Sequence, residues 1–288
     1  MASERARRSH LPKIAAFLAA LSLAPAPARA AGGGCPSGMI QVAGGVLERD
    51  GEPVRVRSFC MDRTEVTVDA YASCVELAAC SATDLECGNA ATWNRKGHGA
   101  HPINCVTWDE AESFCREHGK RLPTEEEWEW AARGGRRALT FPWGEEPPAD
   151  RACWDGEGNS KGAGERKATC TVGSSPRSRS ADGIQDLAGN VREWTSTSQE
   201  RFRVLRGGSW GDSLPEFLST SFRGWNAPDE RMELLGFRCA SPIGAVARRP
   251  ARRTQTARAT TDEAGVMVFS APIEVGKPAS RGKRSGSR

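Results

Sequence analysis

The sequence predicts an α+β domain of irregular architecture that is stapled by disulfide bonds and has little regular secondary structure. Its ten cysteines are even in number and all lie between Cys35 and Cys239. Its 31 glycines and nine tryptophans are spread through turn-rich stretches that separate short apolar segments. Two helix-start signatures lie close together, yet no long amphipathic period follows either of them.

The first thirty residues have the pattern of a secretory signal peptide. Basic residues precede an apolar run from Ile14 to Ala24, and Ala28-Arg29-Ala30 matches an A-x-A cleavage site. The apolar run is too short to cross a hydrocarbon layer of about 30 Å. We therefore expect an exported protein, periplasmic or extracellular, whose folded domain covers residues 31–244.

Residues 245–288 form a basic tail, with ten Lys and Arg side chains against three Asp and Glu. Because it contains little apolar material, we expect it to be disordered, with 266–273 as a candidate short strand. Such a tail suits contact with an acidic surface, although a solvated tail without a specific partner is the simpler interpretation. The two ends together hold 15 of the 40 basic and four of the 36 acidic side chains, which leaves residues 31–244 acidic by seven. The folded part therefore gives no reason to expect specific nucleic-acid binding.

Short elements are expected along the domain. Apolar alternation predicts β-like segments at 35–42 and 54–59, and Thr67 is placed to cap a first helix. Capping boxes at 107–110 and 124–127 predict two further helices. Their acidic residues satisfy helix ends, so we do not assign them to paired-carboxylate catalysis.

The cysteines of an exported chain predict up to five disulfide bonds. Zinc binding is the alternative use of so many cysteines. The sequence has no Cys-x-x-Cys pair, however, and its four histidines do not cluster with cysteines. Disulfide bonds are therefore the preferred interpretation.

Seven segments together, in order, resemble the formylglycine-generating (sulfatase-modifying) enzyme family. They are residues 60–67, 101–111, 119–135, 141–144, 186–195, 206–210 and 235–240. The resemblance covers about residues 35–241 and implies a single irregular domain of the C-type-lectin-like kind. It also implies an oxygen-dependent oxidase that converts a substrate cysteine to formylglycine through a copper-binding cysteine pair.

That cysteine pair is missing from this chain. In the family both thiols lie shortly after the Gly-Gly-Ser-aromatic motif, and here Asp212 and Phe217 fall approximately at their positions. No cysteine lies between Cys170 and Cys239, and soft thiolates are the ligands that copper(I) prefers. We therefore expect no copper and no conventional formylglycine synthesis. An iron site, as in the related sulfoxide-forming branch, is not expected either, because His98, His101 and His118 show no facial arrangement.

The resemblance implies other sites as well. Cys115 and Cys239 match a structural disulfide of the family; Cys35 with Cys60 and Cys153 with Cys170 are further expected pairs, and the four remaining cysteines pair among themselves. The family's calcium loop matches residues that would supply carboxylate or backbone oxygens to a structural Ca²⁺ ion: Asp186, Gly189, Val191 and Glu193.

Two functions from different classes remain open. The first is an accessory or non-catalytic member, a monomer that binds a peptide or protein ligand in the former substrate cleft. The floor of that cleft is expected to include Ser209, Trp210, Asp212 and Trp225, since tryptophan offers apolar contact area and aspartate a charge. The second is an oxygen-dependent oxidase that uses another thiol or another metal. The fold alone does not decide between them.

Overall fold

The computed structural model describes residues 33–159, 161–246, 248, 250–251, 259–261 and 267–269. The signal peptide expected at 1–30 lies outside the described residues. So does most of the expected tail. Within the tail, β10 (Ala259–Thr261) and β11 (Met267–Phe269) form an antiparallel pair, and β11 lies inside the segment expected to contain a strand.

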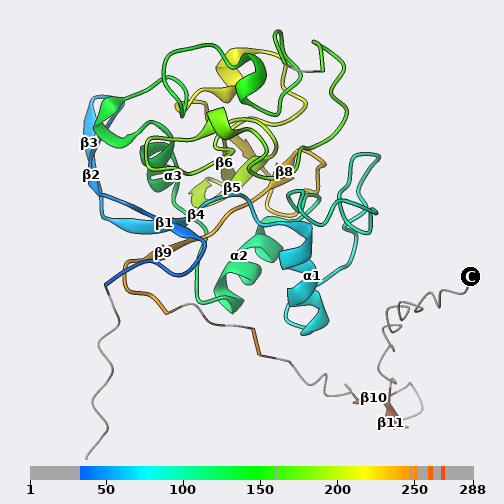
Figure 1. Ribbon diagram of the computed structural model, residues 1–288. Coiled ribbons are helices and arrows are strands. Elements are labelled where there is room, and N and C mark those ends of the chain that lie inside the picture. Colours follow the sequence, from blue (N-terminus) through cyan, green and yellow to red (C-terminus); the bar gives the residue numbers. More distant parts are fainter. Residues whose placement is uncertain are drawn as a thin grey trace, which may run out of the picture. The chain divides into compact units, whose positions relative to one another are not determined.

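The elements of the domain are short, as the sequence predicts (Figure 1). The strands are β1 (Met39–Val42), β2 (Gly45–Arg49), β3 (Glu52–Val56), β4 (Phe59–Asp62), β5 (Arg192–Gln199), β6 (Phe202–Arg206), β7 (Gly224–Asn226), β8 (Leu235–Gly236) and β9 (Ala240–Pro242). The helices are α1 (Val68–Glu76), α2 (Trp108–Glu117) and α3 (Glu125–Ala132), with 3-10 turns η1 (Gly135–Arg137), η2 (Ala149–Arg151), η3 (Pro176–Ser178) and η4 (Pro215–Leu218). Long loops connect them, and no helix among the described residues is long and apolar enough to cross a membrane.

Three small sheets organise this part of the chain. A four-stranded sheet has the order β7-β6-β5-β8, with β8 parallel to β5 and the other pairs antiparallel. A three-stranded sheet has the order β1-β4-β9, so the last strand of the domain pairs with a strand near its beginning. The hairpin β2–β3 forms the third sheet. Helix α3 packs against β5 and β6 on one side and β3 on the other, and thereby links the four-stranded sheet to the hairpin.

Local hydrogen bonds explain where the helices begin. The hydroxyl of Thr107 accepts from the backbone N–H of Glu110, and the Glu110 carboxylate accepts from the backbone N–H of Thr107. Thr124 and Glu127 repeat this arrangement at α3. Each capping box satisfies two backbone donors that a helix start leaves unpaired. The two boxes predicted from sequence are therefore confirmed.

Tryptophan packing accounts for much of the core. Five of the nine tryptophans are buried: Trp108, Trp128, Trp130, Trp154 and Trp194. The first and last belong to a cluster under α1 and α2, the next two to a cluster between α3 and the β1–β4 sheet, and Trp154 to a third cluster near η4. Each of their indole N–H groups donates to a backbone carbonyl or, for Trp128, to the Glu193 carboxylate, which satisfies the polar atom of each ring.

All ten cysteines form disulfide bonds. The pairs are Cys35–Cys60, Cys74–Cys80, Cys87–Cys105, Cys115–Cys239 and Cys153–Cys170. Three of these are the pairings expected from the sequence, and the other two resolve the four cysteines whose partners it left open. Five disulfides fit a protein that folds in an oxidising compartment.

Candidate functional site

The carboxylate of Asp212, which stands near the position of one family thiol, closes a buried turn. It accepts hydrogen bonds from the backbone N–H and the hydroxyl of Ser209, at 2.7 and 2.9 Å. It also forms an ion pair with Arg192 on β5, at 2.5 Å between Nη2 and Oδ1. Ser209 is fully buried and Asp212 nearly so. Ser209 and Arg192 are therefore the partners of this carboxylate.

Phe217, near the position of the other thiol, lies on η4 and is half-buried. Its ring packs on the cluster that contains Trp154 and meets Phe222 edge-on, with 5.1 Å between ring centroids. Its carbonyl oxygen lies 2.6 Å from where a side chain on Gly208 would begin, and Gly208 has a φ of +66°. Both the close contact and the positive φ require glycine at position 208. The loop of the Gly-Gly-Ser-Trp motif therefore contacts η4 directly.

No thiol lies near these two residues. Every cysteine of the chain is paired, so no free thiol exists in this structure. The thiolate pair that would bind copper(I) is therefore not available from the chain's own side chains.

The expected cleft floor needs a correction. Ser209 and Asp212 are buried against each other and Arg192, so they do not present polar groups to a ligand. Trp225 is 53% exposed, and Trp210 is partly buried with its indole N–H donating to the Glu233 carbonyl. The structure thus places two of the four residues at a surface and two beneath it.

A second exposed apolar side chain, that of Met232, contacts the residue that follows Trp225. Met232 is 37% exposed, and the Asn226 side-chain nitrogen lies 3.3 Å from its sulfur atom. Asn226 follows Trp225 on β7, which is an edge strand of the four-stranded sheet. We call Trp225 and the edge of β7 that carries it the Trp225 surface. It combines apolar contact area with an unpaired strand edge, the two features that a bound peptide uses.

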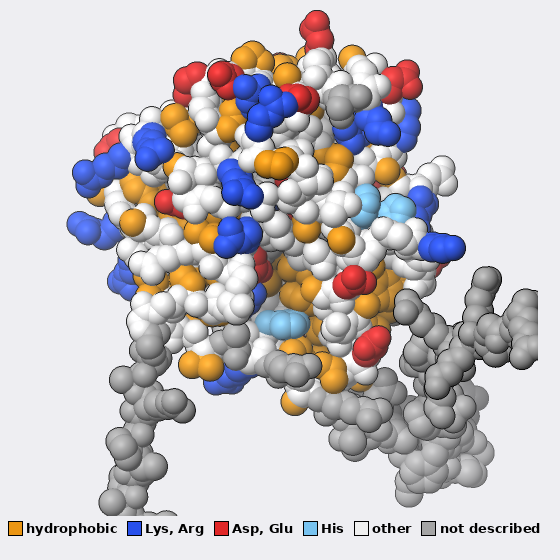
Figure 2. All heavy atoms as spheres, in the orientation of Figure 1, with side chains coloured by type: hydrophobic (Ala, Val, Ile, Leu, Met, Phe, Trp, Pro, Cys, Tyr) orange, Lys and Arg blue, Asp and Glu red, His pale blue; other side chains and the backbone are white. Residues whose placement is uncertain are grey.

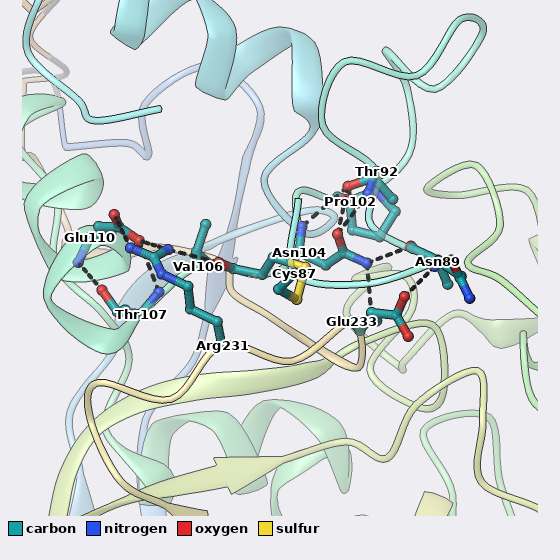
Figure 3. Close-up of a disulfide and its surroundings, with 12 residues drawn as sticks. Cys87, Asn89, Thr92, Pro102, Asn104, Val106, Thr107, Glu110, Arg231 and Glu233 are labelled. Atoms are coloured by element: carbon teal, nitrogen blue, oxygen red, sulfur yellow. Dashed lines mark hydrogen bonds and ion pairs between the residues drawn. A yellow bond between two sulfur atoms is a disulfide. The ribbon is translucent and has the colours of Figure 1, made fainter. Parts of the chain in front are cut away.

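The loop that carries Met232 is held rigidly (Figure 3). Arg231 donates from Nη1 and Nη2 to the two oxygens of Glu110, at 2.6 and 2.8 Å. The side-chain amide of Asn104 donates to the Glu233 carbonyl at 2.8 Å. Figure 3 shows these contacts on both sides of one disulfide bond. Met232 was not predicted, because residues 226–234 match no motif and its exposure depends on these distant partners.

The predicted calcium loop lies deep in the domain. Both oxygens of Glu193 accept from the fully buried guanidinium of Arg238, and one also accepts from the indole N–H of Trp128, at 2.7 to 2.8 Å. Asp186 is buried as well, and one of its oxygens accepts from the backbone N–H of Gly173. In the described part of the chain, no three His, Cys, Asp or Glu side chains gather as a metal cage. Backbone carbonyl oxygens, such as those expected from Gly189 and Val191, would have to complete the coordination shell of a bound Ca²⁺ ion.

The charge balance around Asp186 fits a cation. Glu65 is buried, and one of its oxygens has no hydrogen-bond partner among the described residues. Burial, followed by repulsion from Asp186, raises the pKa of Glu65 well above its ordinary value. Three buried carboxylates, those of Glu65, Asp186 and Glu193, thus oppose the one guanidinium of Arg238. Either a proton or a bound cation can neutralise the excess charge, so calcium at this loop stays a prediction.

The histidines considered for iron are engaged elsewhere. His98 and His101 pack ring to ring, 4.5 Å apart, and Nδ1 of His101 lies 2.8 Å from the hydroxyl of Thr169. His118 is the C-terminal cap of α2 and packs on Phe114. The three rings therefore do not converge on one point.

The chain is similar to proteins of one known family. Residues 28–243 match the family described as "Sulfatase-modifying factor enzyme 1-like domain". A protein named "Inactive C-alpha-formylglycine-generating enzyme 2" from Bos taurus is 39% identical over 156 residues, which cover 50% of this chain and 51% of that protein. The "Formylglycine-generating enzyme" of Streptomyces coelicolor is 34% identical over 169 residues, covering 50% and 54%.

A solved structure shows a similar fold. The structure of PvdO from Pseudomonas aeruginosa aligns with a TM-score of 0.58 at 22% identity and covers 71% of this chain and 94% of that one. The similarity to PvdO concerns the fold alone. The chain spans about half the length of the curated relatives it matches.

Proposed function

The chain belongs to the sulfatase-modifying factor enzyme 1-like family, and we propose that within this family it is a ligand-binding or accessory module rather than a formylglycine synthase. The observation that carries the proposal is that all ten cysteines are in disulfides. Formylglycine synthesis through thiols needs a reactive cysteine, and the residues near the expected thiol positions are a buried carboxylate and a packed phenylalanine. Neither is a soft, redox-active ligand.

The similarity to a protein named as inactive supports this proposal. That protein is as similar to this chain as any relative described above. A relative named as an active enzyme matches a comparable share of the chain at lower identity. Similarity over half of each sequence does not decide activity, which depends on the residues present at the site.

The Trp225 surface is the proposed ligand site. Trp225 and Met232 are among the large apolar side chains that the described domain exposes, and Trp225 lies on the edge strand β7. A peptide in an extended conformation suits this arrangement, since its backbone pairs with the strand edge while an apolar side chain contacts the tryptophan. Because Arg231 and Glu233 fix the neighbouring loop, the surface loses little conformational entropy on binding.

The proposed site of action is outside the cytoplasm. The basic and apolar pattern of residues 1–30 and the A-x-A site support export. The five disulfides are consistent with that route, because such bonds persist in oxidising compartments. The ligand is then a peptide or protein of the periplasm or the extracellular space.

A first experiment tests the absence of catalysis. Purified mature protein is incubated with copper(I), oxygen and a peptide containing Cys-x-Pro-x-Arg, and the products are analysed by mass spectrometry. We expect no aldehyde, while a conventional family member assayed alongside forms it. Aldehyde formation by this protein would overturn the proposal and require another thiol or metal.

A second experiment tests binding at the Trp225 surface. A random peptide library is selected on the immobilised protein, and the enriched peptides are measured by fluorescence anisotropy. Trp225→Ala should weaken their binding by about tenfold or more, since an exposed tryptophan at an interface typically contributes over 1 kcal/mol. Leu214→Ala, which removes another exposed apolar side chain, is the matched control and should change affinity little. Equal binding by wild type and Trp225→Ala would reject this surface.

A further inference from the structure

A second surface, separate from the Trp225 surface, lies on the hairpin β2–β3. The turn η1 packs against β2, and together with the hairpin it borders a hollow of about 510 Å³. A side chain on Gly45 would begin 2.4 Å from the ring of Trp130, so glycine lets β2 lie directly on that ring. The base of the hairpin is therefore fixed against α3, and the hollow has a rigid wall.

Three arginines line this hollow without a carboxylate partner. Arg55, Arg57 and Arg136 are exposed, and none forms an ion pair with another described residue. No Asp or Glu lines the hollow, and the hydroxyl of Ser58 adds one more potential donor. Three guanidinium groups from two short segments, the end of β3 and the turn η1, thus line one space.

Nearby arginines behave differently. Arg49, Arg206 and Arg223 all form ion pairs with Glu125 beneath the hairpin. These three contribute to the core, whereas the positive charge of the hollow is left for solvent or a ligand. The contrast indicates that this charge has no structural role in the described fold.

The hollow also contrasts with the domain as a whole. Residues 31–244 are acidic by seven, yet Figure 2 shows Lys and Arg side chains gathered along the edge where Figure 1 places β2 and β3. A local positive surface on an acidic domain attracts anions to one place instead of binding them generally. Because the domain as a whole is acidic, the long-range attraction of anions stays modest. Binding of an anion then depends on the positions of the arginines.

The groove is longer than one anion. A second hollow of about 340 Å³ shares Val46 and Arg136 with the first and adds Arg133 and Glu48 to the lining. A single sulfate or phosphate ion would fill a small part of this space. A ligand that carries several oxyanions along its length can engage several of these arginines at once, since each can bind one oxyanion through two N–H groups.

The residues that line the two hollows favour one class of polyanionic ligand over the others. The large exposed apolar side chains of the described residues all lie outside both hollows, and a membrane-binding face needs such residues. Trp130 is only 4% exposed and gives no stacking platform for single-stranded nucleic acid. Val46 and Val56 are the apolar side chains of the first hollow, which leaves few pockets for the side chains of an acidic peptide. We propose that this β2–β3 groove binds an anionic polysaccharide through its sulfate or carboxylate groups.

The test compares two double variants of the full mature chain. Isothermal titration calorimetry measures a heparin-derived hexasaccharide against wild type, Arg57→Ala/Arg136→Ala and Arg63→Ala/Arg179→Ala. The last is a matched control, since Arg63 and Arg179 are exposed, lie outside the groove and change the net charge equally. The basic tail is present in all three proteins and contributes equally. We expect the groove variant to lose about tenfold in affinity and the control to stay within about twofold.

Hydrogen exchange locates the ligand independently of affinity. The hexasaccharide should slow exchange in residues 44–58 and 133–137, and the groove variant should lose this protection while its melting temperature stays that of wild type. Equal loss in both double variants, or protection confined to other segments, would overturn the proposal. Tighter binding of polyglutamate or of anionic phospholipid vesicles than of the hexasaccharide would also overturn it.

Discussion

Asp212 and Arg192 form a 2.5 Å ion pair between the Gly-Gly-Ser-Trp motif loop and the four-stranded sheet. The carboxylate belongs to the loop after β6, and the guanidinium belongs to β5. The pair therefore fastens the motif loop to the sheet. A residue that the family resemblance predicted near a thiol position is thus part of the structural framework.

Asp212→Ala should destabilise the domain by about 3 kcal/mol. The substitution leaves the Arg192 charge and the Ser209 donors without their acceptor, and unpaired buried polar groups cost about 1–3 kcal/mol each. Urea unfolding followed by tryptophan fluorescence measures the loss. Asp229→Ala removes an exposed carboxylate and serves as control, with an expected change below about 0.5 kcal/mol. Similar stabilities for the two variants would show that the ion pair does not stabilise the loop.

The disulfides should contribute unequally. Cys115–Cys239 joins residues 124 positions apart, whereas Cys74–Cys80 spans only six. Constraining the unfolded chain is worth about 5 kcal/mol for the long loop and roughly 2 kcal/mol for the short one. Replacing each pair by two serines and measuring unfolding in denaturant checks the difference. A larger loss for the short pair would contradict the loop-entropy argument.

The sequence predicted those features that local contacts determine. Capping at Thr107 and Thr124 depends on a residue three positions away, and the structure has both capping boxes. Burial of Ser209 was not predictable in this way, since it depends on Asp212 and through it on Arg192 from another strand. The same holds for Met232, which lies on a loop positioned by distant partners.

Disulfide pairing shows the same limit. Four cysteines allow three pairings, and spacing alone did not select among those at 74, 80, 87 and 105. The structure selects Cys74–Cys80 and Cys87–Cys105, which join residues 6 and 18 positions apart. Each cysteine of this group pairs with its neighbour in the sequence, but no motif of the chain marked that choice over the other two.

Acid should weaken the ion-pair cluster at Glu125. Burial opposes ionisation, but the hydrogen bond from Arg223 and the charges of Arg49 and Arg206 outweigh it and lower the pKa of Glu125 below its ordinary value. The folded state therefore favours the ionised carboxylate. The resulting stability is present above the ordinary pKa of about 4.5 and is lost as the pH falls through the lowered value.

Glu125→Gln tests this pH dependence. At pH 7 the variant should be less stable than wild type by about 3 kcal/mol, because three arginines lose a buried partner. The difference should shrink as the pH falls below about 4.5. Glu112→Gln, at an exposed helix pair, should differ from wild type by less than about 0.5 kcal/mol. Unfolding curves at several pH values measure both variants, and a pH-independent deficit for Glu125→Gln would reject the electrostatic account.

Calcium should stabilise the domain through the buried carboxylates around Asp186. The carboxylates of Glu65, Asp186 and Glu193 face the single positive charge of Arg238 and therefore repel one another. A bound cation would reduce this repulsion, as a proton on Glu65 does when no cation is bound. Millimolar calcium should raise the melting temperature of chelator-treated protein by several degrees, and Asp186→Asn should abolish the rise. Asp155→Asn, whose carboxylate bonds the backbone of Arg166, keeps the predicted loop intact and should retain the rise. An unchanged melting temperature in the wild type would mean that the proton and Arg238 neutralise these carboxylates without a metal ion.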